Sequence, residues 1–220
     1  MPEIIFNGPQ GRLEGRYHHA TKSNPPVALI LHPHPQHGGN MNNRIVYGLY
    51  QTLARRGFSL LRFNFRGVGR SQGVFNSGMG ELADAAAALD WLQNANIGAR
   101  GCWVTGYSFG AWVGLHLLMR RPEITTFIAV SPPVALHDFS FLAPCPASGL
   151  IVHGTNDAFV SEATVAHLAD RLARQRGPAV MCRTIAGADH FYRDHLEVLV
   201  REIEAYVDRM DLPPTRDMAP

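Results

Sequence analysis

Short apolar runs alternate with helix-like segments along most of this 220-residue chain. A continuous apolar run is typical of a strand that is covered on both faces, as in a parallel sheet. The alternation therefore predicts an α/β fold, with a mostly parallel, twisted sheet of about eight strands and helices on both faces. The predicted strands are Glu3–Phe6, Leu13–His18, Val27–His32, Ser59–Phe65, Cys102–Tyr107, Thr125–Ser131, Gly149–Gly154 and Ala179–Ile185.

Five segments that follow these strands have the composition or spacing of helices. Glu81–Asn94 is the clearest, because it is rich in alanine and leucine, and Ser161 is predicted to cap another. We expect a single domain over residues 1–210 and a flexible C-terminal tail over residues 211–220. The predicted helices are Arg44–Arg56, Glu81–Asn94, Ala111–Arg121, Ser161–Gln175 and Leu196–Val207.

Composition and charge exclude several classes of protein. Hydrophobic residues make up 46% of the chain and charged residues 17%, which is typical of a globular protein rather than a disordered one. The net charge is only +2 and the basic residues are scattered, so we expect no nucleic-acid partner. No apolar run approaches the roughly 18 residues of a membrane span, so we expect no membrane partner either. A homodimer is left open.

The cysteines and the N-terminus indicate where the protein works. Cys102, Cys145 and Cys182 are widely spaced and odd in number, which favours free thiols in a reduced, cytoplasmic setting over a disulfide framework. The N-terminal segment carries Glu3 and its apolar run breaks at Asn7, so it lacks the apolar core of a signal peptide. A cytoplasmic location is the resulting expectation.

The segment GYSFG, residues 106–110, lies between a predicted strand and a predicted helix. G-x-S-x-G in that context is typical of a sharp turn that raises a nucleophilic serine above a sheet edge. The two glycines are needed because side chains there would collide with neighbouring backbone. Ser108 is therefore the candidate nucleophile, and it needs a base and an acid that orients the base.

The downstream loops supply candidates for both partners. Asp157 follows the strand Gly149–Gly154, and His190 follows the strand Ala179–Ile185. Carboxyl ends of parallel strands meet at one edge, so these side chains should lie beside Ser108. The order serine, acid, histidine is also the order that this topology uses. The competing residues are Asp138, Asp189, His137, His153 and His195.

These three motifs, GYSFG, HGTNDAFV and GADHF, together resemble the α/β-hydrolase superfamily over nearly the whole chain. The nearest resemblance is to small, lidless bacterial serine hydrolases of the dienelactone-hydrolase-like esterases. Dienelactone hydrolases themselves use cysteine, and Ser108 stands there in this chain, so their substrate is not carried over. The segment LRFNFRGVGRSQG also resembles the loop after the fourth strand of that fold, where Arg66 is predicted to make structural hydrogen bonds.

The segment LHPHPQHGG follows the third predicted strand, where this superfamily places its oxyanion loop. Pro33 and Pro35 carry no N–H, so the N–H of His34 is the predicted donor there, and that of Phe109 is the second. A zinc site at His32, His34 and His37 is the alternative. The prolines would splay His32 and His34 apart, and no cysteine or carboxylate lies nearby in sequence, so we expect no metal and no cofactor.

Ser131–Gly149 is too short and too rich in proline for a helical cap, so the resemblance implies an open site without a cap domain. The predicted substrate pocket is aromatic, and a small-molecule acyl ester is the expected partner. We therefore expect a carboxylesterase for short-chain esters. An acyl-CoA thioesterase, an amide or peptide hydrolase and a non-catalytic binding protein are the alternatives. The predicted pocket residues are Trp112, Phe159, Phe191 and Tyr192.

Overall fold

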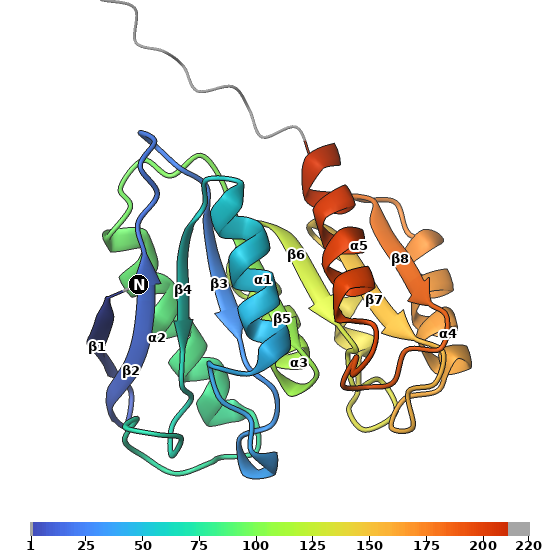
Figure 1. Ribbon diagram of the computed structural model, residues 1–220, viewed down its shortest axis with the longest axis horizontal. Coiled ribbons are helices and arrows are strands. Elements are labelled where there is room, and N and C mark those ends of the chain that lie inside the picture. Colours follow the sequence, from blue (N-terminus) through green and yellow to red (C-terminus); the bar gives the residue numbers. More distant parts are fainter. Residues whose placement is uncertain (1, 211–220) are drawn as a thin grey trace, which may run out of the picture.

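The computed structural model describes residues 2–210, and all of their strands join one eight-stranded sheet (Figure 1). The strand order is β1-β2-β4-β3-β5-β6-β7-β8. Strands β3 to β8 run parallel to one another, and β2 is antiparallel to both of its neighbours, β1 and β4. The strands are β1 (Glu3–Gly8), β2 (Gly11–His18), β3 (Val27–Leu31), β4 (Ser59–Phe63), β5 (Cys102–Tyr107), β6 (Ile124–Val130), β7 (Ser148–Gly154) and β8 (Val180–Ile185).

Helices cover both faces of this sheet, as Figure 1 shows. Side chains of α1 and α5 pack with one buried cluster, and those of α2, α3 and α4 pack with the other. The central strands are buried on both faces, which explains their continuous apolar sequences. The helices are α1 (Arg44–Arg55), α2 (Met79–Asn94), α3 (Phe109–Leu118), α4 (Glu162–Ala173) and α5 (Leu196–Arg209), with short 3₁₀ turns η1 (Pro35–His37) and η2 (Ser140–Leu142).

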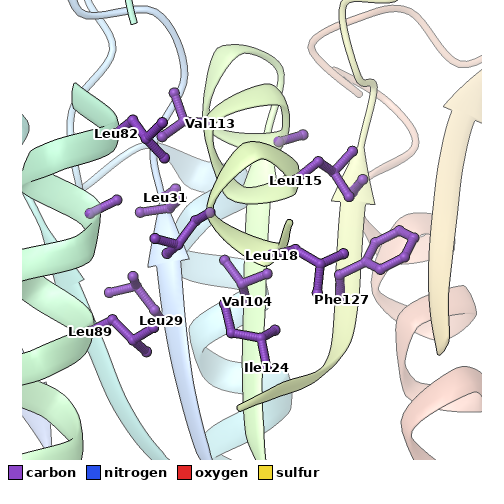
Figure 2. Packing of buried hydrophobic residues seen from close by; sticks show 14 of the residues in the cluster. Leu29, Leu31, Leu82, Leu89, Val104, Val113, Leu115, Leu118, Ile124 and Phe127 are labelled. Atoms are coloured by element: carbon purple, nitrogen blue, oxygen red, sulfur yellow. The ribbon is translucent and has the colours of Figure 1, made fainter. Parts of the chain in front are cut away.

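The larger cluster lies between the centre of the sheet and helices α2 and α3. In Figure 2, Leu29 and Leu31 of β3 lie close to Leu82 and Leu89 of α2. The side chains of α3 fill the space over β5 and β6 in the same view. This packing fixes the start of α3, and therefore the residue that precedes it, against the middle of the sheet.

The α/β-hydrolase fold class is confirmed, and the element boundaries differ by a few residues. Helix α2 begins at Met79 rather than Glu81, because the Glu81 carboxylate accepts the N–H groups of Gly78 and Asn76 and so caps the first turn. Helix α3 begins at Phe109 rather than Ala111, directly after the serine turn. Ser161 caps α4 as predicted. The predicted tail, residues 211–220, lies outside the described residues.

The connection between β6 and β7 carries no cap in the described part of the chain, because residues 131–147 contain only η2. This confirms the expected lidless architecture. The loop after β4 is braced by a buried ion pair in which Arg66 donates two hydrogen bonds to Asp84 of α2, at 2.9 and 2.7 Å. Arg66 thus makes the structural hydrogen bonds predicted for it. Across residues 2–210, no helix is long and apolar enough to cross a bilayer.

Candidate active site

Ser108 sits on the turn between β5 and α3 with φ 53° and ψ −120°, a backbone conformation that non-glycine residues rarely adopt. Main-chain crowding around it accounts for both glycines of GYSFG. A Cβ on Gly106 would collide with the backbone of Gly110, and a Cβ on Gly110 would lie 2.5 Å from the carbonyl oxygen of His32. The Ser108 N–H donates to the carbonyl of Val130 on β6, at 2.8 Å.

Ser108, His190 and Asp157 form one continuous chain of hydrogen bonds. His190 Nε2 lies 3.1 Å from Ser108 Oγ, and His190 Nδ1 lies 2.6 Å from Asp157 Oδ2. The other carboxylate oxygen, Oδ1, accepts the N–H groups of Phe159 and Val160 at 2.9 and 3.1 Å. The three residues come from the carboxyl ends of β5, β7 and β8, so the structure brings together the predicted set.

The carboxylate of Asp157 is charged at neutral pH. Burial raises its pKa, but the hydrogen bond and charge of His190 and the two backbone N–H groups outweigh that effect, so the pKa of Asp157 lies below its ordinary value. With an ionised carboxylate at Nδ1, the proton of a neutral His190 belongs on Nδ1. Nε2 is then left free to accept the Ser108 hydrogen.

Two buried tyrosines hold the loop that carries His190. Tyr107, the residue before Ser108, donates its hydroxyl to the carbonyl oxygen of His190 at 2.9 Å. Tyr192 hydrogen-bonds through its hydroxyl to Ser131 Oγ at 3.0 Å. Sequence reasoning missed the role of Tyr107, because the partner of its hydroxyl lies 83 residues away along the chain.

The competing acids and histidines have other surroundings. Asp138 accepts two hydrogen bonds from Ser140 in an exposed loop, and Asp189 pairs with Arg193. His153 is buried, with Nδ1 3.9 Å from Asp157 Oδ2, and neither of its ring nitrogens has a hydrogen-bond partner among the described residues. Neither of the remaining two histidines hydrogen-bonds to Ser108 among the described residues. His195 lies at the start of α5, and His137 lies in the loop after β6, where it stacks on Trp112.

The loop after β3 is held by His32, whose side chain is fully buried. Its Nε2 accepts the N–H of Phe65 at 3.0 Å, which places the ring proton on Nδ1, 2.6 Å from the carbonyl oxygen of Pro33. Burial lowers the pKa of His32 to about 4. His32 is therefore a neutral brace behind the loop, and neither of its nitrogens is free for a metal ion. Within residues 2–210, no group of three side chains could hold one.

The N–H groups of His34 and Phe109 make no hydrogen bond to any described residue. Both residues line the cavity that also contains Ser108. Gly39 is required nearby because a Cβ there would collide with the carbonyl of Pro33. These two N–H groups are thus available to a bound oxygen atom at the predicted positions.

The cavity over Ser108 has a volume of about 330 Å³. Of the predicted pocket residues, Phe159 and Phe191 line it, 52% and 42% exposed. Trp112 and Tyr192 do not. Trp112 packs behind the wall against Phe109 and His137, and Tyr192 is fully buried beneath the site. The lining residues are Pro33, His34, His37, Gly38, Gly39, Asn43, Tyr107, Ser108, Phe109, Pro133, Leu136, His137, Phe159, His190 and Phe191.

Sequence reasoning missed the contribution of His37, Leu136 and His137 to this lining. Their positions depend on how the loops after β3 and β6 fold over the sheet edge. The histidine-rich segment LHPHPQH is the signal that could have pointed to His37, but its pattern predicts an oxyanion loop with a metal site as the alternative, and neither uses His37 to line a substrate pocket.

Three solved structures are similar over almost their whole length. A protein of unknown function from Agrobacterium tumefaciens, described as an α/β-hydrolase, is 53% identical with a TM-score of 0.93, covering 97% of this chain and 99% of that one. An α/β serine hydrolase homologue from Coxiella burnetii is 32% identical, with a TM-score of 0.86 and coverage of 94% and 97%. A lidless α/β serine hydrolase from Xanthomonas campestris is 28% identical, with a TM-score of 0.87 and coverage of 97% and 96%.

Fold, site geometry and these relatives together define the class, and the protein is an α/β-hydrolase of the serine-hydrolase type. The sequence pattern described as X-Pro dipeptidyl-peptidase (S15 family) matches residues 14–176, and the chain belongs to that family. The matched region includes Ser108 and Asp157 and ends before His190.

Proposed function

We propose that this protein is a cofactor-free serine carboxylesterase that cleaves small acyl esters. Ser108 is the nucleophile, His190 the general base and then the general acid, and Asp157 the group that orients His190. The observation that carries the proposal is the unbroken hydrogen-bond chain from Asp157 to the Ser108 hydroxyl, which opens into the cavity. We also propose a cytoplasmic location, which the free thiols of all three cysteines support.

The reaction proceeds in two halves. His190 Nε2 takes the Ser108 proton as Oγ attacks the acyl carbon, and the N–H groups of His34 and Phe109 bind the oxyanion. His190 then protonates the departing alcohol. A water molecule then enters the open cavity, loses a proton to His190 and attacks the acyl carbon. His190 returns that proton to Ser108 Oγ as the acid leaves. Asp157 stabilises the imidazolium in both halves.

Pocket chemistry favours esters over the substrates suggested by the family name. An X-Pro dipeptidyl-peptidase must accommodate a positively charged peptide N-terminus, which a pocket binds with carboxylates. None of the described residues that line this cavity is Asp or Glu. Amide hydrolysis and thioester hydrolysis remain the rival candidates, because the same Ser108 mechanism serves both. Comparing kcat/KM for p-nitrophenyl butyrate, butyryl-CoA and an Ala-Pro anilide would rank them.

The test of the proposal is the Ser108→Ala variant. Turnover of p-nitrophenyl butyrate should fall by about 10⁴-fold or more, with the fold intact by circular dichroism. A fluorophosphonate should add its mass to the native protein at Ser108 and leave the variant unlabelled. Unchanged turnover in the variant contradicts the nucleophile assignment. An unlabelled native protein would favour the non-catalytic binding protein.

A further inference from the structure

The lining of the cavity contains two groups of different chemistry. Phe159 and Phe191 pack against His190 with ring centroids 5.0 and 5.5 Å away. His34, His37 and His137 also line the cavity, and the proposed mechanism does not use their side chains. His34 lies close enough to the other two to feel their charge, and we call these three residues the imidazole wall. The ring centroids of His34 and His37 are 4.5 Å apart, and His137 stacks on Trp112 at 4.4 Å.

We propose that the imidazole wall binds an anionic group, a carboxylate or a phosphate, that the substrate carries at a distance from its ester bond. The inference rests on the proposed esterase function and names the substrate class of the same site. Imidazoles donate N–H hydrogen bonds and become cationic when an anion is near. Three of them on one wall form a surface that suits oxygen acceptors.

Electrostatics around the cavity agree with this assignment. None of its lining residues in the described chain is Asp or Glu, so an anion would meet no carboxylate there. Two helices begin at the cavity, since Phe109 is the first residue of α3 and Asn43 is the N-cap of α1. The N-terminal end of a helix carries a partial positive charge, which adds to the attraction.

One imidazole has a defined proton position. Nδ1 of His34 accepts the N–H of Gln36 at 3.3 Å, so the proton of the neutral ring lies on Nε2. That N–H is a donor without a partner among the described residues. The proposed anion site uses only the side chain of His34, and the backbone N–H of the same residue still binds the oxyanion. His34, which lines the cavity, thus has a side-chain and a main-chain N–H that are both without a partner among the described residues.

Neighbouring charges set the pH at which the wall is most attractive to anions. Burial, then His37 and His137, lower the pKa of His34, and the buried Glu81 of α2 acts in the opposite direction. Burial also lowers the pKa of His137. The other titratable neighbours are His190, which lines the same cavity, and His116, which packs against Trp112 and feels the charge of Asp138. His34 and His137 therefore hold a proton less readily than ordinary histidines, and an anion should bind more strongly at pH 6 than at pH 8 because the lower pH favours the cationic rings.

The test compares esters that differ mainly in charge. Mono-p-nitrophenyl adipate and p-nitrophenyl hexanoate place the charge on the acyl side, and 3-acetoxybenzoate and its methyl ester place it on the alcohol side. For one of these pairs, the anionic ester should have a kcat/KM about 10-fold higher at pH 6, as expected for a charge-assisted hydrogen bond. The preference should shrink at pH 8, and inorganic phosphate should inhibit competitively.

Substitutions in the imidazole wall test whether its histidines cause the preference for anionic esters. The double variant His37→Gln/His137→Gln should lose most of the anionic preference, measured as the ratio of kcat/KM within a pair. His116→Gln is the matched control, because His116 packs against Trp112 outside the cavity, and it should keep the ratio. Equal kcat/KM within both pairs at pH 6, or a ratio that survives the double variant, overturns the proposal.

A binding experiment separates this proposal from the esterase proposal. Disodium adipate should bind Ser108→Ala protein at pH 6 in a calorimetric titration, and about 10-fold more weakly once His37 and His137 are also glutamine. Adipate binding without turnover of any ester would contradict the proposed function and support the imidazole wall. Ester turnover without adipate binding would do the reverse.

Discussion

The turn that carries Ser108 and the loops that surround it are held in place by different kinds of contact. At the turn, main chain packs against main chain, and the glycines of GYSFG are the only residues that fit. The loops carrying His190 and His34 are held by buried side chains, Tyr107 in one case and His32 in the other. The first kind of contact is steric, and the second depends on a few hydrogen bonds.

This difference predicts which parts of the site tolerate substitution. A steric contact between backbones cannot be relieved by a rotamer change, so any side chain at Gly110 must move whole elements. A loop held by one hydroxyl or one imidazole can shift by a fraction of an ångström when that group is lost. Activity in such a variant should fall while the fold survives. Variants of the turn should therefore lose stability, and variants of the loops should lose activity.

Replacing Asp157 by Asn should lower kcat for p-nitrophenyl butyrate by about 10⁴-fold, because the amide favours the wrong tautomer of His190. Steady-state kinetics at pH 7.5 measure it, with circular dichroism to verify the fold. Asp138→Asn is the matched control, since that exposed carboxylate accepts its hydrogen bonds from Ser140 in its own loop. If Asp157→Asn kept its activity and Asp138→Asn lost it, the acid would be Asp138.

Replacing Gly110 by Ala should lower the free energy of unfolding by about 4 kcal/mol, because the new methyl group would meet the carbonyl oxygens of Leu31 and His32. Urea unfolding measures the loss. Gly57→Ala is the control for a glycine in open space, where only its positive φ opposes the change. A Gly110→Ala variant as stable as the native protein would show that the turn is not fixed by main-chain crowding.

His32 should make stability depend on pH between about 6.5 and about 4. Its folded pKa is lowered to about 4 by burial, whereas the unfolded chain takes up this proton near pH 6.5. The contribution of the neutral His32 ring to the free energy of unfolding is therefore fully present above pH 6.5. Up to about 3 kcal/mol of it is lost as the pH falls towards 4.

Urea unfolding from pH 7.5 to pH 4.5 would measure this dependence. His32→Gln should have a shallower slope over that range even if it is less stable throughout. Other buried histidines titrate with the same sign, so the difference between the two slopes isolates His32. If the free energy of unfolding changed with pH equally in the native protein and in His32→Gln, the ring of His32 would not be held neutral by burial.

Replacing Tyr107 by Phe should have the smallest effect, a loss of about 1–2 kcal/mol in transition-state stabilisation, or roughly 10-fold in kcat/KM. The carbonyl of His190 loses its donor, and the loop gains freedom to move the imidazole from Ser108. Tyr206→Phe is the control, because the buried Tyr206 hydroxyl has no partner among the described residues. Equal kinetics for both variants would show that Tyr107 does not position His190.

Much of the fold could be predicted because its signals are local. The doubly buried strands show as apolar runs, and the strand-turn-helix around Ser108 shows in five consecutive residues. The predicted helix boundaries differ from the observed ones where a polar side chain caps the helix. Glu81, for example, accepts the N–H of Gly78, so that α2 begins two residues earlier than predicted.

The pocket could be predicted only in part. Phe159 and Phe191 line it, but Trp112 and Tyr192 point elsewhere, and His37, Leu136 and His137 were missed. All seven follow or flank a strand end, so their sequence positions look alike. Which side of a loop faces the cavity depends on packing between loops, and no local pattern records that.

Local sequence determined the order of strands and helices along the chain and the strained turn at Ser108, because short-range sterics and apolar periodicity act between near neighbours. Loop position and chain order also predicted His190, but three-dimensional packing decided that its ring reaches the Ser108 hydroxyl, 82 residues away along the chain, and that the rings of His153 and His137 do not. That choice follows from strand order and from side chains such as Tyr107 that cross between loops, and contacts of this kind exist only once the sheet has formed.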